Sequence, residues 1–493
     1  MSIKAGNIVF VGNGVTLLDR LQTAGPGAVN IKRETIYEVG DYLSVGQVTD
    51  IPDLTFSMES FDVSCALEAF LLNVDPKLTH TYDISTSLPV CVKSQIKAGK
   101  SAASPYATVT SASIPYLRVE QVSYKFGVGS QNASQTVQLR GDSLYYNEGS
   151  AYIESAAGSG SSGQTIVTAN PAYDVVEGGV QRRILAIVAG NSRLNFGTDW
   201  TETYGAVSGG AATTTAHLTA TYPSTTTIFI SYASPTVESF PQSVHALVSG
   251  SHGLTVGSSL AGATSIQTDF NPGVGAEIIL NDVTGSSTTE TAKVTGVAGV
   301  SSPYTLTVAA LTYAHSASEP ASVYVPTVKP AALRGRDINV YVGPAFPVGT
   351  AHGTSRGTRK ISVQSVTVDW RATLANDEEL GNYHYVTTDF DVPQTSGAIA
   401  FRPRDPEELK SIMQTLSGVT AGSTTSSDPT GQPQLDVQIE LLNPVDGRVL
   451  KRIHVPDARF SLPGFSVRAG NNSKLDFTSN FQSDQGLMYV YDN

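Results

Sequence analysis

The two ends of this chain carry similar segments in the same order, and this repetition constrains the fold more than any other feature of the sequence. Residues 6–12 and residues 336–343 both hold a short apolar run that ends in glycine. Residues 31–38 and residues 363–370 both alternate polar and apolar side chains, which is typical of a half-buried strand. The spacing between matched segments drifts along the chain, as loop insertions between two collinear copies would cause. The sequence therefore predicts a duplicated domain.

Each copy contains one well-marked helix at the same place in the series. The first is expected over residues 62–72, where Asp62 or Ser64 can cap the helix and apolar residues share one face. In the second copy Asp405 is the cap and Pro406 takes the first helical position. A single capped helix in each half favours duplication over a chance alignment of two β-rich segments.

A predicted hairpin follows each helix. Residues 88–96 match residues 435–442, and the second copy turns at residues 446–447, an Asp-Gly pair that is a strong hairpin signal. A further pair of strands closes each copy, ending at residues 144–146 and 489–491. The middle of the chain differs, with few charged residues and many Thr, Ser, Ala and Gly.

We therefore expect four regions. Residues 1–150 form a first domain, residues 151–253 a β-rich extension or connecting region, residues 254–326 a small inserted β module, and residues 331–493 a second domain. The module is expected to be Ig-like or similar to a decoration domain, because its short strands are separated by turn residues at close intervals. Whether residues 151–253 belong to the first domain stays open.

Composition sets the fold class and excludes some partners. Charged residues make up only 15% of the 493-residue chain, while 45 Gly and 25 Pro supply many turns. Together with abundant Thr, Val and Tyr, this predicts an all-β protein. The net charge is −12 and no Lys/Arg-rich run occurs. Tight binding of nucleic acid through its phosphates is therefore not expected.

No motif in the sequence predicts catalysis, a cofactor or a metal site. The Gly-x-Ser-x-Gly of residues 353–357 lies in a Gly/Thr loop rather than between a strand and a helix, and the eight His are dispersed. Cys65 and Cys91 are expected to be buried thiols. No secretory signal and no membrane-spanning run of apolar residues are recognised. We predict a protein that is not an enzyme, although a carboxylate pair for glycan cleavage would be visible only in space.

The repeat unit resembles the tail tube domain of long-tailed bacteriophages, which is related to the tube of type VI secretion systems. The resemblance rests on the order of elements in residues 6–12, 31–37, 50–52, 62–72 and 116–146, and it recurs over residues 336–493. It implies a β-sandwich or barrel with one flanking helix and a long loop. It also implies that six such domains close a ring, that rings stack, and that the bore conducts DNA.

Some siphophage tube proteins fuse two copies of the domain, so the resemblance implies a homotrimer with a pseudo-hexameric ring. It implies a virion tail protein that is assembled in the host cytoplasm, with tape measure, tail terminator and tail tip proteins as partners. DNA would pass an acidic bore without tight binding. The inserted module would decorate the outside of the tube.

Two long loops, over residues 41–61 and 372–404, are the expected contacts between subunits or between rings. The candidate contact residues are Asp41, Asp50, Pro52, Phe61, Asp377, Glu379, Asp391 and Pro393. A different class of function stays open, namely a phage decoration, fibre or receptor-binding protein with a carbohydrate-binding β module.

Overall fold

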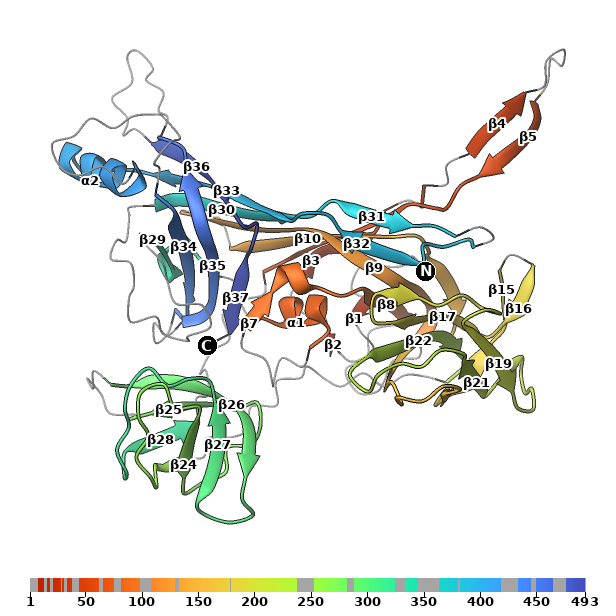
Figure 1. Cartoon of the computed structure of the whole chain (residues 1–493), viewed down its shortest axis with the longest axis horizontal. Coiled ribbons are helices and arrows are strands. Elements are labelled where there is room, and N and C mark those ends of the chain that lie inside the picture. The colour runs from red at the N-terminus through yellow and green to blue at the C-terminus, as the bar shows by residue number, and fades with distance from the viewer. Residues whose placement is uncertain are drawn as a thin grey trace.

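The computed structural model confirms the all-β class. It describes residues 8–12, 16–17, 21–27, 29–30, 33–37, 44–61, 65–74, 81–97, 108–128, 133–177, 179–236, 252–281, 288–323, 333–343, 363–379, 382–417, 433–444, 449–463 and 476–492. These residues hold two α-helices, α1 (Ala66–Leu72) and α2 (Pro406–Ser417), among many strands (Figure 1). Neither is long and apolar enough to cross a membrane.

The strands of the first half pair in a simple order. From one edge to the other they run β3 (Leu21–Pro26), β6 (Leu54–Ser60), β10 (Ser134–Gly141), β9 (Thr108–Gly127), β8 (Val90–Lys97), β1 (Ile8–Gly12) and β2 (Thr16–Leu17). Strand β11 (Tyr145–Glu148) pairs with the first part of β9. Helix α1 lies between β6 and β8 in the chain, and its buried apolar side chains belong to the core.

The second half pairs its strands in the same order. They run β30 (Val363–Arg371), β33 (Gln394–Phe401), β36 (Phe477–Ser483), β35 (Val449–Phe460), β34 (Leu435–Leu442) and β29 (Ile338–Gly343). Strand β37 (Tyr489–Asp492) pairs with the first part of β35, as β11 does with β9. Helix α2 lies between β33 and β34, which is the place of α1 in the first half.

The irregularities of register also match between the halves. Strand β3 has one extra residue between Leu21 and Thr23, which pair with successive residues of β6. Strand β30 has the same bulge between Val363 and Ser365, which pair with successive residues of β33. Strands β8 and β9 slip at two points, and β34 and β35 slip by the same amounts at the same points. Bulges of this kind fix where each strand turns its side chains. The counterpart of β30 is therefore β3.

This pairing corrects one predicted match. Residues 31–38 do not correspond to residues 363–370, because β4 (Arg33–Tyr37) pairs with β5 (Ser44–Thr49) in a separate two-stranded ribbon that projects from the body (Figure 1). The ribbon holds the place between β3 and β6 that β31 (Leu374–Asp377) and β32 (Thr387–Phe390) hold between β30 and β33. The expected loop of residues 41–61 thus contains the strands β5 and β6, and the expected loop of residues 372–404 contains the β31–β32 hairpin and β33.

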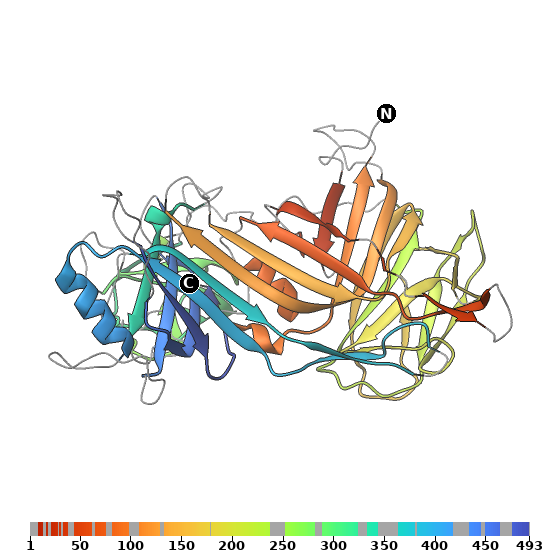
Figure 2. The same cartoon turned by 90° about the horizontal axis from the view of Figure 1, so that it is seen from above.

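The two halves join side by side through one continuous sheet. Strand β30 pairs with β9 from Ser365 opposite Gly127 to Arg371 opposite Gln121, so the long strands of both halves run together (Figure 2). Strand β37 also pairs with β7 (Thr81–Asp83) of the first half. Apolar side chains of both halves form a single buried cluster. The two halves therefore share one hydrophobic core.

Gly397 on β33 shows how closely this sheet is packed. A Cβ atom there would lie 2.2 Å from the Thr367 carbonyl oxygen and 2.4 Å from the Phe481 ring. Replacing Gly397 with alanine should therefore lower the free energy of unfolding by about 1–3 kcal/mol, through backbone displacement. Chemical denaturation measures the change. Gly25→Ala is the control, since a Cβ at Gly25 meets no atom within 4 Å, and an equal loss in both variants would contradict the packing argument.

The helix ends confirm one predicted cap. The backbone N–H of Glu408 donates to Oδ1 of Asp405, 2.7 Å away, and Pro406 opens α2 as predicted. Helix α1 begins at Ala66, and its N-cap residue Cys65 makes no capping bond through its side chain. The alternative caps Asp62 and Ser64 lie outside the described residues. So does the predicted turn at residues 446–447.

The region between the halves has its own layers. Its main sheet runs β12 (Ser150–Ala157), β22 (Thr227–Ser234), β17 (Ile184–Ala189), β18 (Ser192–Arg193), β32 and β31, so its last two strands come from the second half. Shorter pairs cover it: β13 (Thr165–Val167) and β19 (Trp200–Tyr204) on β21 (Thr214–Leu218), β14 (Ala172–Tyr173) on β20 (Ala211–Ala212), and β15 (Val175–Glu177) on β16 (Val180–Arg182).

The remaining strands form a separate six-stranded module with a core of its own (Figure 1). Its strand order is β23 (His252–Leu254), β28 (Pro320–Val323), β25 (Glu277–Leu280), β26 (Glu290–Ala298), β27 (Tyr304–Val308) and β24 (Ser265–Thr268). The sequence predicted short strands in this stretch from its turn residues, and the structure has them.

Candidate functional site

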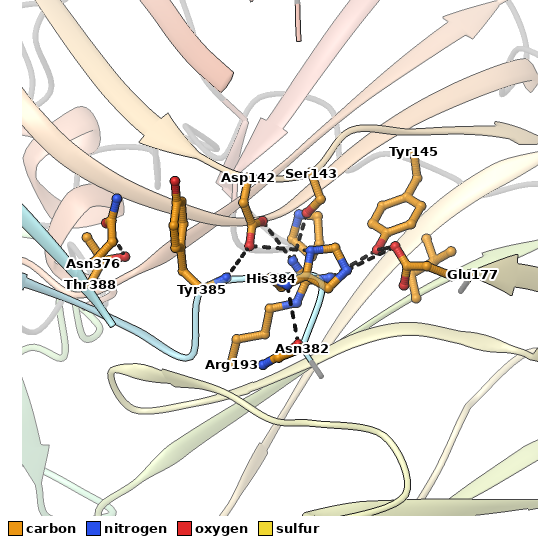
Figure 3. Close-up of polar contacts among 12 residues, drawn as sticks. Asp142, Ser143, Tyr145, Glu177, Arg193, Asn376, Asn382, His384, Tyr385 and Thr388 are labelled. Atoms are coloured by element: carbon orange, nitrogen blue, oxygen red, sulfur yellow. Dashed lines mark hydrogen bonds and ion pairs between the residues drawn. The ribbon is translucent and has the colours of Figure 1, made fainter. Parts of the chain in front are cut away.

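A buried polar cluster ties together three parts of the chain that lie far apart in sequence (Figure 3). Asp142 and Ser143 lie in the connection from β10 to β11, Arg193 lies on β18, and His384 precedes β32. Asp142 is fully buried and the Arg193 side chain is 4% exposed. We call these residues, with Tyr145 and Glu177, the junction.

Arg193 is the centre of the junction. Its Nη1 donates to Oδ1 of Asp142 and to the Ser143 hydroxyl, both at 2.8 Å, and its Nη2 lies 2.9 Å from the Tyr145 hydroxyl. The Tyr145 hydroxyl in turn donates to Glu177 at 2.8 Å. A guanidinium presents its N–H donors in a fixed plane, so one side chain from the middle region fixes β11 and the connection that leads into it from β10.

His384 completes the junction from the second half. Its Nε2 lies 2.9 Å from Oε1 of Glu177, and its Nδ1 lies 3.4 Å from Oδ2 of Asp142. The backbone N–H of Tyr385 donates to the same Asp142 oxygen at 2.9 Å. Asp142 therefore receives contacts from both the middle region and the second half, which locks the three parts in one arrangement.

Local structure brings these groups together. The two-residue turn Gly190–Asn191 joins β17 to β18, and Gly190 takes the left-handed conformation at φ 58° that the turn requires. Ser192 then pairs with Thr387 of β32, which places Arg193 beside His384. The Tyr116 hydroxyl donates to the Asn191 carbonyl at 2.9 Å and holds the turn on the first half.

Apolar packing supports the junction from one side. Cys91 and Tyr116 of the first half pack against Ile153, Val188 and Phe229 of the middle region. Burial raises the pKa of the Cys91 thiol to about 12, so this cysteine behaves as an apolar group at neutral pH. Both cysteines are buried thiols that form no disulfide, as predicted.

The junction holds its carboxylates in the charged form. Burial alone would raise the pKa of Asp142, but the Arg193 guanidinium and His384 outweigh burial and lower that pKa to about 2. Burial likewise opposes ionisation of Glu177, yet His384, Arg182 and Arg193 lower its pKa to about 2. Neighbouring protein groups thus stabilise the two buried carboxylates in their charged form. Such a cluster suits a structural role, in which it holds the three parts of the chain together.

The free energy of unfolding should therefore fall as the pH is lowered into the acid range. Because both carboxylates have a lower pKa in the folded chain than in the unfolded one, their contribution is complete above about pH 4.5 and is lost toward pH 2. For Asp142 the loss amounts to about 2 kcal/mol. Urea unfolding between pH 5 and pH 2.5 measures the slope. An Asp142→Asn variant should show a flatter slope, and an unchanged slope would contradict the assignment.

The predicted contact residues are scattered rather than gathered in the junction. Asp50 and Asp391 are exposed, and each accepts a hydrogen bond from the next backbone N–H, at 2.9 Å and 2.8 Å. Pro52 and Pro393 are half-buried, and they lie two residues before β6 and immediately before β33. The two Asp-aliphatic-Pro turns thus have the same local structure in both halves.

The other predicted contact residues lie near the middle region or on the sheet. Phe61 follows β6 and is half-buried. Asp377 accepts a 2.6 Å hydrogen bond from Thr387, and Glu379 accepts one of 3.1 Å from Asn195 of the middle region. Asp41 lies outside the described residues. The sequence had no signal for Arg193 or His384, since each is a single basic residue that belongs to no recognisable motif.

The face of the sheet away from the core carries an open hollow of about 540 Å³ on the second half. Its lining is mainly uncharged and polar: Thr367, Asp369, Ser396, Gly397, Ala398, Arg459, Ser461, Asn480, Phe481 and Gln482. The described residues contain no group of three or more side chains that could hold a metal ion. The Gly-x-Ser-x-Gly of residues 353–357 lies outside them.

No protein-family model matches the sequence, and no curated protein matches it either. Among solved structures, a chain of the PVC extracellular contractile injection system sheath–tube complex in its extended state is 15% identical, with 32% of this chain and 88% of that chain covered and a TM-score of 0.21. A chain of the anti-feeding prophage tube-terminating cap is 11% identical, with 34% and 96% covered and a TM-score of 0.23. A chain of the anti-feeding prophage baseplate is 16% identical, with 34% and 97% covered and a TM-score of 0.21.

Proposed function

We propose that this protein is a structural subunit of a phage tail tube, in which rings of three chains stack around a bore that conducts DNA. The observation that carries the proposal is the repetition of one strand order, with its bulges, in both halves of the chain. We infer from it that the halves are two fused copies of one tube domain. The proposed role involves no catalysis.

We expect two chains to pair in the same way as the two halves pair inside one chain. Strand β9 of the first half pairs with β30 of the second, and β30 is the counterpart of β3. Among the described strands, β3 pairs only with β6, so its outer edge can receive the second half of another chain in the same manner. Repeating one heterologous contact closes a ring when the rotation permits, and closure buries the strand edges.

The polar face of the joined sheet would line the bore. The hollow on this face carries one acid, Asp369, and one base, Arg459, beside uncharged groups. A lining of this kind differs from the acidic bore that the resemblance implied. The hollow itself has no cluster of Lys and Arg that would hold DNA phosphates, so DNA would slide past it.

The proposal extends to the partners of a tail tube. The chain's first partner is itself, in rings and stacks, and the tape measure, terminator and tail tip proteins would meet the tube bore and its ends. The ribbon β4–β5 projects from the body and would contact a neighbouring chain (Figure 1). The site of action would be the virion tail, assembled in the host cytoplasm.

Electron microscopy of the concentrated purified protein tests the proposal. Hollow tubes with three chains per ring support both the tube and the fused duplication. Six chains per ring would keep the tube and reject the duplication argument. Solid fibres or discrete trimers without a bore would favour the decoration, fibre or receptor-binding class instead.

A further inference from the structure

A second buried charged cluster lies where the two halves meet. Glu68 of α1 is fully buried, and its Oε1 accepts hydrogen bonds from the Tyr124 hydroxyl at 2.5 Å and from Gln135 Nε2 at 2.6 Å. The third donor is Nζ of Lys451, 2.5 Å away, on β35 of the second half. The Lys451 side chain is 1% exposed, so one charge of the pair comes from each half.

Stability alone is a poor explanation for this pair. Burying two charges costs desolvation that their attraction seldom exceeds, and apolar side chains of similar volume often fill such a site equally well. The other carboxylate oxygen of Glu68, Oε2, has no hydrogen-bond partner among the described residues, which adds to the cost. The matched registers of the two halves show what the pair does instead.

The two charged members of the cluster have uncharged counterparts in the other half. The slips that β8–β9 and β34–β35 share place Thr110 at the position of Lys451. The pairing of β10 with β6 and of β36 with β33 places Phe477 at the position of Gln135 and Phe401 at that of Ser60. Phe401 and Phe477 stack at 5.9 Å, and the buried residues of α2 carry no charge.

These differences make like halves incompatible. If the first half of another chain took the place of the second half, Thr110 would face Glu68 and leave a buried charge unpaired. If two second halves met, Lys451 would face the apolar Phe401–Phe477 stack. Rejection of a wrong partner by an unpaired buried charge is a general route to specificity.

We propose that Glu68 and Lys451 form a pairing code that admits only a second half beside α1 of a first half. The code stops first halves from polymerising through β9 of one chain and β3 of another, because β3 is the counterpart of β30, the partner of β9 in the native joint. This rule concerns which half lies beside which, and it holds whether or not the chain forms tubes. Within the proposed ring, it makes the halves alternate.

A disulfide reporter in the full-length chain tests the code. Lys125 lies opposite Thr367 in the native joint, and Gly25 is the counterpart of Thr367. Chains with Lys125→Cys are mixed with chains carrying Gly25→Cys, refolded together from denaturant and oxidised. A disulfide between the two chains forms only when two first halves pair, because the native joint and the proposed joint between chains keep these positions apart.

In this reporter background, the apolar double variant Glu68→Leu with Lys451→Met should raise the interchain disulfide about fivefold or more, and the yield should grow with protein concentration. The matched control is Glu440→Leu with Arg452→Met, which removes a buried pair of 3.1 Å inside the second half and should leave the yield at the wild-type level. Circular dichroism confirms that both variants fold. A disulfide yield in the apolar double variant equal to that of the wild type would overturn the pairing code. Tube formation is measured separately by electron microscopy, so that failure of the code and failure of the proposed function can be told apart.

Discussion

Replacing Arg193 with methionine is expected to lower the free energy of unfolding by about 3–5 kcal/mol, the loss seen when one partner of a buried ion pair is removed. Arg193 supplies hydrogen bonds to Asp142, Ser143 and Tyr145, and its side chain is 4% exposed. Methionine fills a similar volume but leaves the Asp142 carboxylate buried, with His384 as the remaining side chain that can pair with it. The loss is measured by urea denaturation at pH 7.

The matched control is Arg402→Met. Arg402 pairs with Asp476 at 2.7 Å, but both side chains are well exposed, so no measurable change is expected. A second variant separates charge from packing, since Arg193→Met combined with Asp142→Leu should recover part of the lost stability. If Arg193→Met were as stable as wild type, the junction would not hold the three parts of the chain together.

Features with a local signal were predicted well from the sequence. Asp405 and Pro406 mark the start of α2 by their own chemistry, and the structure places the helix there. The two Asp-aliphatic-Pro turns were matched correctly for the same reason. The all-β class followed from composition, which does not depend on how the strands pair.

Strand partners were harder to predict. Residues 31–38 and residues 363–370 alternate polar and apolar side chains alike, but alternation belongs to each strand alone and does not say which neighbour it takes. Only the ladder shows that β3, with its Gly25-Pro26 end, is the counterpart of β30. Glycine and proline obscure a strand signal in sequence, although both are tolerated at a sheet edge.

The polar clusters could not be predicted. Asp142, Arg193 and His384 meet because β18 pairs with β32, a contact between residues far apart in the chain. Glu68 is a single charged residue between the apolar Leu67 and Ala69 of a helix. Lys451 lies on a strand, where a lysine is usually expected to face solvent. Their burial results from the joint between the halves, which no local pattern specifies.

The edge of β3 gives the prediction with the largest effect on assembly. The Gly27 N–H donates to the Thr55 carbonyl at 2.7 Å, so Gly25 and Gly27 bond to β6, and the Ala24 N–H points to the outer edge. The counterpart of Ala24 is Val366, which pairs with Phe126 of β9 in the native joint. The Ala24 N–H is therefore the donor that the proposed joint between chains would use.

Replacing Ala24 with proline should abolish tubes while the chain stays folded. Proline removes only the outward N–H, and its ring would obstruct an incoming strand, whereas proline on an edge strand is compatible with the fold. Pro26 lies two residues after Ala24 and already has no backbone N–H to point outward. If Ala24 also lost its N–H, the outer edge of β3 would lack two successive donors and could not pair along its length.

The control Ala24→Val keeps the N–H and installs the residue that the native joint has at this position, so it should form tubes like wild type. Sedimentation velocity and electron microscopy at equal concentrations measure the difference, and thermal unfolding of dilute protein confirms that Ala24→Pro is folded. Tubes from Ala24→Pro at the wild-type concentration would show that β3 is not the edge through which chains join. Loss of tubes in both variants would place the defect in the Ala24 side chain and reject the role of its N–H. If chains join through β3 in the way that β9 joins β30 inside the chain, only the proline variant should lose its tubes.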